Sequence, residues 1–256
     1  VGRYAALLDD GLAEWIAANV PFPSTMVDRI VPATTDDDRR QIAKIIGVKD
    51  AWPVITEPFS QWIIEDTFCA GRPDFASSGA EFVSDVEPYE HMKLRMLNGA
   101  HSTLAYLGQL LELETVADAM QHPHLRGLVG NVMDEAAQTL AMPSSDLGRY
   151  KSALLNRFAD KDLRHRTAQI AMDGSQKIPQ RLLASIHDAQ AAGTPWGALA
   201  IGVAGWISYI KANDPDDPMA GRFADLRHIA PDATSFAKAM LDIPEVFGAL
   251  SDADWF

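Results

Sequence analysis

The chain has 256 residues, of which 47% are hydrophobic and 22% charged, with a formal net charge of -13 at pH 7. A chain of this length can bury a sizeable core, and its proportions of hydrophobic and charged residues are those of an ordinary globular protein. The acidic charge argues against a general nucleic-acid binder, which needs a basic patch. The single cysteine, Cys69, excludes a disulfide framework and is consistent with a cytoplasmic protein.

The start of the chain predicts helix, then loop, then helix. Residues 2–20 have a helical period that begins almost at Val1, so we expect the chain to be part of a longer protein. The residues at the start do not show the charged and then apolar pattern of a secretory signal, so we do not expect one. Three prolines predict an irregular extended loop over residues 21–35. Thr35 is a typical N-cap for the next helix, and Gly47 is a typical C-cap.

The remaining chain is predicted to be mainly helical with a small β excursion. Residues 51–68 and 80–86 are rich in β-branched and aromatic residues, which predicts a hairpin or a small mixed sheet. Helices are expected at 88–111, 114–121, 124–140, 145–158, 162–172, 178–191, 196–212 and 232–241. The apolar stretch at 196–210 is shorter than the roughly 20 residues of a membrane span, so it predicts a buried helix and no membrane partner.

One predicted helix carries three polar side chains that a core helix does not need. Within residues 88–111, Lys93, Asn98 and His101 share one broad face, since Asn98 lies about 140° and His101 about 80° from Lys93 at about 100° per residue. A desolvated lysine can move a proton, while an amide and an imidazole can hold a substrate oxygen. The set therefore indicates carbonyl–alcohol interconversion without a metal. The alternative is that these side chains are solvated or serve packing.

Five segments resemble one enzyme family in the same order along the chain. They are FPSTMVDRIVPAT, ITEPFSQWIIED, GRPDF, VEPYEHMKLRMLN and DGSQKIPQR. In addition, KLRMLNGAH matches the K-x4-N-x2-H signature of the polyol-specific long-chain dehydrogenases, the mannitol dehydrogenase family. The resemblance covers about residues 11–210.

The resemblance implies a domain organisation and roles for individual residues. Residues 1–256 would be a single helical catalytic domain, resembling the carboxy-terminal domain of 6-phosphogluconate dehydrogenase-like enzymes. An amino-terminal Rossmann domain of the same parent chain, absent here, would bind NAD, with NADP not excluded and the cofactor-binding residues unknown. Lys93 would be the general acid/base, Asn98 and His101 would hold the reacting oxygen, and Asp28 and Lys177 would bind substrate.

A departure from the mannitol-type pattern bears on the substrate. Gln169 stands where mannitol-type members carry an arginine, and the segment resembles the fructuronate reductase (D-mannonate oxidoreductase) branch more closely. Arg166, Lys177 and Arg181 would then clamp a substrate carboxylate. The alternatives are mannitol 2-dehydrogenase or another polyol dehydrogenase, and, in another class, a non-catalytic helical binding or assembly module.

Other candidates have simpler interpretations. His122 and His124 flank a proline, which predicts a loop or helix cap rather than a metal site. Asp214, Asp216 and Asp217 are expected in a solvated loop. The glycine pair in GVAGW, at 202–206, predicts close helix packing rather than a phosphate cradle.

Overall fold

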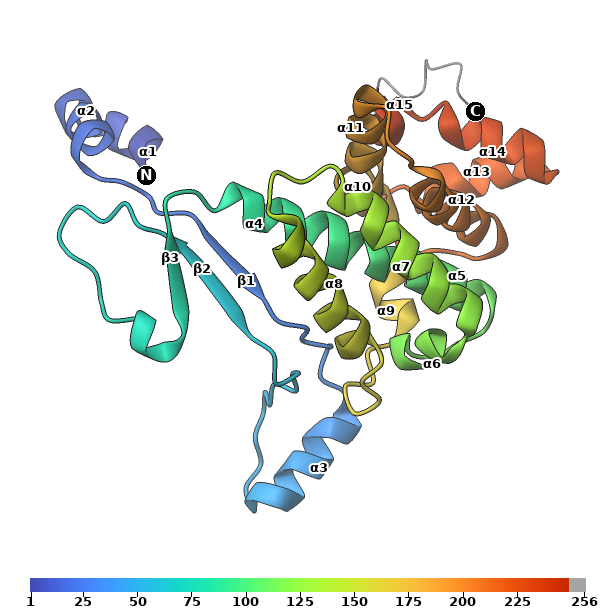
Figure 1. Ribbon diagram of the computed structural model, residues 1–256, viewed down its shortest axis with the longest axis horizontal. Coiled ribbons are helices and arrows are strands. Elements are labelled where there is room, and N and C mark those ends of the chain that lie inside the picture. The colour runs from blue at the N-terminus through green and yellow to red at the C-terminus, as the bar shows by residue number, and fades with distance from the viewer. Residues whose placement is uncertain (249–256) are drawn as a thin grey trace. The chain divides into compact units, whose positions relative to one another are not determined.

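The computed structural model describes residues 1–248 and divides into two compact units. The first contains residues 1–30 and 57–90, and the second contains residues 31–56 and the described residues from 91 onward. Figure 1 shows the helices and strands of both units. The helices are α1 (Gly2–Ala6), α2 (Asp10–Asn19), α3 (Asp36–Ile46), α4 (Glu87–Met92), α5 (Gly99–Leu110), α6 (Val116–Gln121), α7 (Pro123–Ala137), α8 (Ser144–Phe158), α9 (Thr167–Ala171), α10 (Gly174–Ile178), α11 (Ala184–Ala192), α12 (Gly197–Ala212), α13 (Ala220–Ile229), α14 (Ala233–Leu241) and α15 (Pro244–Phe247). Two π-helical segments (Lys93–Asn98 and Pro179–Leu183), a 3₁₀ helix (Ala76–Ser78) and strands β1 (Thr25–Asp28), β2 (Gln61–Glu65) and β3 (Ala80–Val83) complete the elements.

The strands of the first unit form one mixed sheet in the order β1-β2-β3 (Figure 1). β1 pairs with β2 antiparallel and β2 pairs with β3 parallel. Met26 from β1 and Ile63 from β2 are buried together with Val86 in a small core. The mixed sheet is confirmed, but the loop expected over 21–35 contains β1, because its prolines lie outside the four residues that pair with β2.

Buried polar groups hold the end of β1. Asp28 is fully buried because alternate residues of β1 face the core, as Met26 does. The Glu57 carboxylate accepts a 2.6 Å hydrogen bond from the Ile30 backbone N–H, and the Glu57 carbonyl accepts from the Arg29 guanidinium. Glu57 is therefore a structural support of this chain segment.

The second unit is built around α5, which is buried over nearly its whole length. α12 packs closely against it at two glycines: a Cβ at Gly202 would lie 2.5 Å from the Thr103 hydroxyl, and one at Gly205 would lie 2.8 Å from Leu107. The Glu135 carboxylate from α7 accepts hydrogen bonds from the first backbone N–H groups of α12. The predicted buried helix and its glycine packing are both confirmed.

α3 begins and ends where the sequence predicts. The Thr35 hydroxyl accepts from the Asp38 N–H, the Asp38 carboxylate accepts from the Thr35 N–H, and Gly47 adopts the left-handed conformation at φ 75°.

Elsewhere the helices differ from the prediction. The helix expected at 162–172 is confined to α9, since Arg164 has a positive φ of 46° and Arg166 pairs with Thr115 in an isolated β-bridge. α13 and α15 were not predicted.

The described chain is mostly helical, so the mainly α prediction is confirmed. The expected likeness to 6-phosphogluconate dehydrogenase-like enzymes stays a prediction. Among residues 1–248, no helix combines the length and the apolarity needed to cross a membrane.

Candidate functional site

Lys93 and Asn98 are the first and last residues of a π-helical segment that links α4 to α5. Both are half-buried. A π-helix closes hydrogen bonds from residue i to i+5 and is wound with more residues per turn than an α-helix, so residues five apart are separated by a smaller angle around the helix axis. The angle between Lys93 and Asn98 is therefore smaller than the one expected for an α-helix, and the two side chains share a face more closely than the sequence indicates.

His101 lies in the first turn of α5, buried between two other rings. The Phe158 ring stacks on it at 4.9 Å and 17°, and the His165 ring meets it edge-on at 4.8 Å. Burial lowers the pKa of His101 well below its usual 6.5, and the neighbouring His165, Arg181, Arg157 and Lys177 lower it further. Burial also lowers the pKa of His165, to about 4. Both imidazoles are therefore neutral at pH 7.

The His101 ring carries a polar atom without a protein partner. Among the described residues, no group lies within hydrogen-bond range of the buried His101 Nε2. An unpaired polar atom in a protein interior is costly and calls for an explanation. A substrate oxygen or an ordered water at Nε2 would satisfy it.

Arg181 lies beside this histidine on the second π-helical segment. Its guanidinium donates to the Ser102 hydroxyl at 3.1 Å, and burial lowers its pKa. The helices approach closely here, since a Cβ at Gly99 would lie only 2.8 Å from the Arg181 carbonyl oxygen. Because Gly99 has no side chain, the second π-helical segment can pack against the start of α5. This packing brings Arg181 to Ser102, the residue that follows His101.

Lys177 lies one turn before Arg181, on α10. Its ammonium donates to the carbonyls of Met172 and Ile170 and lies 3.9 Å from the Asp173 carboxylate. Burial, and then the charge of Arg181, lower its pKa. Lys177 and Arg181 are therefore two cations close enough to influence the charge state of His101.

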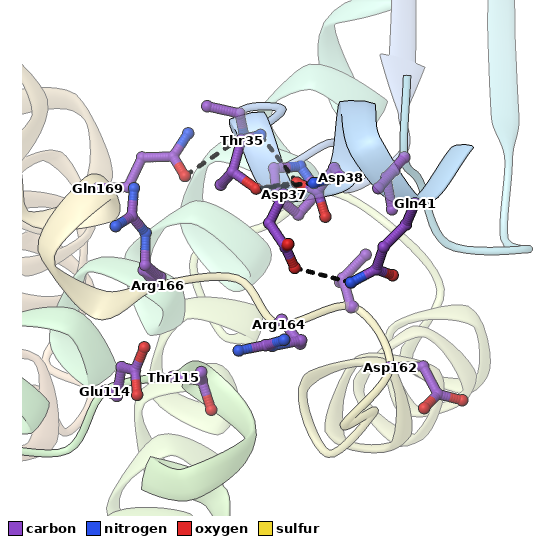
Figure 2. A pocket seen from close by; sticks show the side chains of 14 residues that line it. Thr35, Asp37, Asp38, Gln41, Glu114, Thr115, Asp162, Arg164, Arg166 and Gln169 are labelled. Carbon is purple, nitrogen blue, oxygen red and sulfur yellow. Dashed lines mark hydrogen bonds between the residues drawn. The ribbon is translucent and has the colours of Figure 1, made fainter. Parts of the chain in front are cut away.

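Arg166 and Asp28 are the other two residues predicted to bind substrate. Arg166 lines a polar pocket together with Arg164 and Gln169, and none of Lys93, Lys177 or Arg181 lines that pocket (Figure 2). Asp28 belongs to the first unit. The structure thus brings together His101, Lys177 and Arg181, but does not group Arg166 with them.

The remaining polar candidates have structural roles. His122 is the N-cap residue of α7, as predicted for a helix cap. Asp217 is buried and accepts from the Ser175 N–H and hydroxyl, which corrects the expectation of a solvated loop. Within residues 1–248, no group of three or more His, Cys, Asp or Glu side chains is arranged to hold a metal.

Phe158 and His165 are site residues that the sequence did not reveal. They come from the end of α8 and from the segment before α9, and neither lies in a recognisable motif. Only the packing of these elements against α5 brings their rings to His101.

Two family models match the chain. Residues 85–256 match the mannitol dehydrogenase C-terminal domain, and residues 3–77 match the mannitol dehydrogenase Rossmann domain. The chain therefore belongs to the mannitol dehydrogenase family. The expectation of a single helical domain over residues 1–256 stays a prediction, with residues 3–77 matched by the other domain model.

Individual relatives agree with this membership. The chain is 46% identical to the uncharacterized oxidoreductase YdfI of Escherichia coli, over 97% of this chain and 53% of the relative. It is 48% identical to D-mannonate oxidoreductase of the same organism, over 93% and 51%. The structure of Pseudomonas fluorescens mannitol 2-dehydrogenase in ternary complex with NAD and D-mannitol superposes with a TM-score of 0.83 at 36% identity, over 97% and 52%. The chain spans about half the length of these relatives.

Proposed function

We propose that the whole protein is a cytoplasmic NAD-dependent oxidoreductase that interconverts D-fructuronate and D-mannonate. NAD, when bound, accepts or supplies the hydride at the substrate's carbonyl carbon. The sequence contains no glycine-rich GxGxxG turn that could cradle a dinucleotide pyrophosphate, so no residue of this chain is assigned to hold NAD. The proposal for this chain concerns the substrate and its proton.

Lys93 is the proposed general acid/base. In the direction of reduction it gives a proton to the oxygen that gains negative charge as hydride arrives, and in oxidation it takes that proton back. Asn98 and His101 position this oxygen, with the neutral imidazole acting as a hydrogen-bond donor rather than a second acid. Asp28 is proposed to bind substrate hydroxyls.

The proposal of a sugar-acid substrate rests on the two cations beside His101, which are Lys177 and Arg181. Lys177 and Arg181 are half-buried and close to the histidine, where a carboxylate would offset their mutual repulsion. The 48% identity to a D-mannonate oxidoreductase supports the same substrate class. Mannitol 2-dehydrogenase activity is the second candidate, favoured by the likeness to the P. fluorescens enzyme.

Turnover by the whole protein tests the proposal. NADH oxidation is measured with D-fructuronate, D-tagaturonate and D-fructose side by side, for the unaltered protein and for Lys93→Ala. We expect turnover of fructuronate, reduced at least about a hundredfold in Lys93→Ala, because general acid/base catalysis contributes about 10²–10⁴-fold.

Each other outcome has a defined meaning. A preference for fructose would move the protein to the mannitol branch. Turnover of none of the three sugars by the folded protein would favour a non-catalytic binding or assembly module.

A further inference from the structure

Arg95 is a charged side chain buried in the middle of the first π-helical segment, between Lys93 and Asn98. Burying an arginine is costly unless its charge and its N–H groups are matched by partners. The proposed reaction gives this residue no role, so its position inside the segment that carries Lys93 calls for another explanation.

The contacts of Arg95 lie on two other helices. Its Nη1 donates to the Thr139 hydroxyl at 2.7 Å and to the Thr139 carbonyl at 3.2 Å, just after the end of α7. The same nitrogen lies 2.7 Å from the Asp188 carboxylate of α11. The Thr139 hydroxyl in turn donates to the Ala136 carbonyl, which fixes its orientation. Arg95 therefore joins the π-helical segment to both α7 and α11.

The segment that Arg95 anchors has an uncommon backbone. The Gly99 N–H bonds to the Leu94 carbonyl five residues back, where an α-helix would use the carbonyl four residues back. π-helical turns are rare and occur mostly as single turns within α-helices, frequently at functional sites. An α-helical form here would widen the angle between Lys93 and Asn98. Contacts outside the segment can favour the π-helical form over the commoner one.

Arg95 supports the segment from the side roughly opposite Lys93, because two residues are about half a turn of such a helix. Arg95 is buried, whereas Lys93 and Asn98 are half-buried. In addition, α11, which carries Asp188, continues directly from the second π-helical segment, which carries Arg181. The contact between Arg95 and α11 therefore links the two segments of the candidate site.

We propose that Arg95 is a positioning residue, whose contacts with Thr139 and Asp188 hold the first π-helical segment in the form that sets the spacing of Lys93 and Asn98. Arg95 touches no substrate and transfers no proton. Its effect on turnover rests on the proposed function, in which Lys93 moves the proton and Asn98 positions the oxygen. A misplacement of about 1 Å can cost about a hundredfold in rate, even when its cause lies away from the reacting atoms.

Steady-state kinetics of the whole protein, with NADH and the sugar that it reduces, test this role. We expect kcat to fall about ten- to a hundredfold in Arg95→Met, while KM changes less than about threefold, because the cations that bind substrate remain. Arg95→Lys keeps the charge but loses the planar guanidinium, so kcat should fall less. When Arg95→Met is combined with Asp188→Ala, kcat should fall no further than in Arg95→Met alone, since Asp188 acts through Arg95.

Arg227→Met is the matched control. Arg227 of α13 also donates to backbone carbonyls and pairs with a carboxylate, but it lies outside both π-helical segments. Its partners are Ile210, Asn213 and Asp214. Its loss should lower the free energy of unfolding, as the loss of Arg95 does, and should leave kcat at the value of the unaltered protein.

Hydrogen exchange of the same variants, without NAD or substrate, reports on the segment itself. The amides of residues 93–99 should exchange about tenfold faster or more in Arg95→Met, and at the unaltered rate in Arg227→Met. This measurement needs no turnover. A protein that reduces none of the sugars but shows the faster exchange would contradict the proposed dehydrogenase activity and support the anchoring by Arg95.

Two results would overturn the role of Arg95. If residues 93–99 exchanged at the unaltered rate in Arg95→Met, the arginine would not hold the segment. If these residues exchanged faster but kcat stayed at the value of Arg227→Met, Arg95 would serve stability alone.

Discussion

At the scale of single residues, the most unusual group is the pair of buried imidazoles. His101 and His165 touch edge to face, and burial holds both pKa values below the usual one for histidine. Two charged imidazoles at this distance would repel each other. Because both are neutral, no further positive charge is added beside Arg181.

The pKa of His165 predicts a pH dependence of stability. In the unfolded chain His165 takes up a proton near pH 6.5, whereas in the folded protein it does so only near pH 4. The unfolded state therefore binds more protons between these values. The stability that neutral His165 contributes is fully present above about pH 6.5 and is lost as the pH falls toward about 4. Urea unfolding near pH 7 and near pH 5 measures this loss.

His165→Asn should show a smaller loss between these two pH values than the unaltered protein. His187→Gln, which replaces an exposed histidine of α11, is the control and should lose as much stability as the unaltered protein. If His165→Asn showed the full loss, His165 would not be the group responsible.

At the scale of elements, the two π-helical segments organise the site. One carries Lys93 and Asn98 and the other carries Arg181, and they approach where Gly99 meets the Arg181 carbonyl. An added side chain at this point meets backbone rather than a flexible side chain, so the helices would have to separate. The glycine is thus a requirement of the site as well as of the packing.

Gly99→Ala should therefore destabilise the protein by about 1–3 kcal/mol, the usual cost of overpacking. Gly127→Ala, in the middle of α7 with no atom near the added Cβ, is the matched control. It should stabilise the protein by about 0.5–1 kcal/mol, because alanine is the better helix former. Urea unfolding of both variants measures these changes, and equal effects would contradict the close approach at Gly99.

At the scale of the whole molecule, the two units differ in their cores. The first unit has a small core of Met26, Ile63 and Val86, and its helix α2 has no buried residue. The second unit buries α5 and α12 over most of their length. Local stability rises with the number of buried apolar contacts and hydrogen bonds, so the units should differ in how readily they open.

Hydrogen exchange followed by mass spectrometry checks this difference. The amides of α5 and α12 should exchange slowest, those of β1–β3 faster, and those of α2 fastest. Exchange of the β-strands as slow as that of α5 would mean that the small core of the first unit is as stable as the large one.

The candidate site was predictable only where its residues lie in a local motif. The K-x4-N-x2-H spacing and the five family-like segments predicted the family, which the family models and relatives confirm. The roles of Lys93, Asn98 and His101 stay predictions. The shared role given to Arg166, Lys177 and Arg181 also stays a prediction. Arg166 lines a polar pocket, and of the helix expected at 162–172 only residues 167–171 are helical.

The sequence by itself determined what depends on neighbours along the chain: the caps of α3, the apolar period of α12 and the spacing of Lys93, Asn98 and His101. Hydrophobic period and capping act over a few residues, so they can be recognised from the residues alone. Only the tertiary structure decided which rings enclose His101, where the helices become π-helical, and that Arg164 and Arg166 line a polar pocket. These features arise because distant segments pack against α5 or pair with the turn before α6, and the energies of such contacts depend on residues far apart in the sequence.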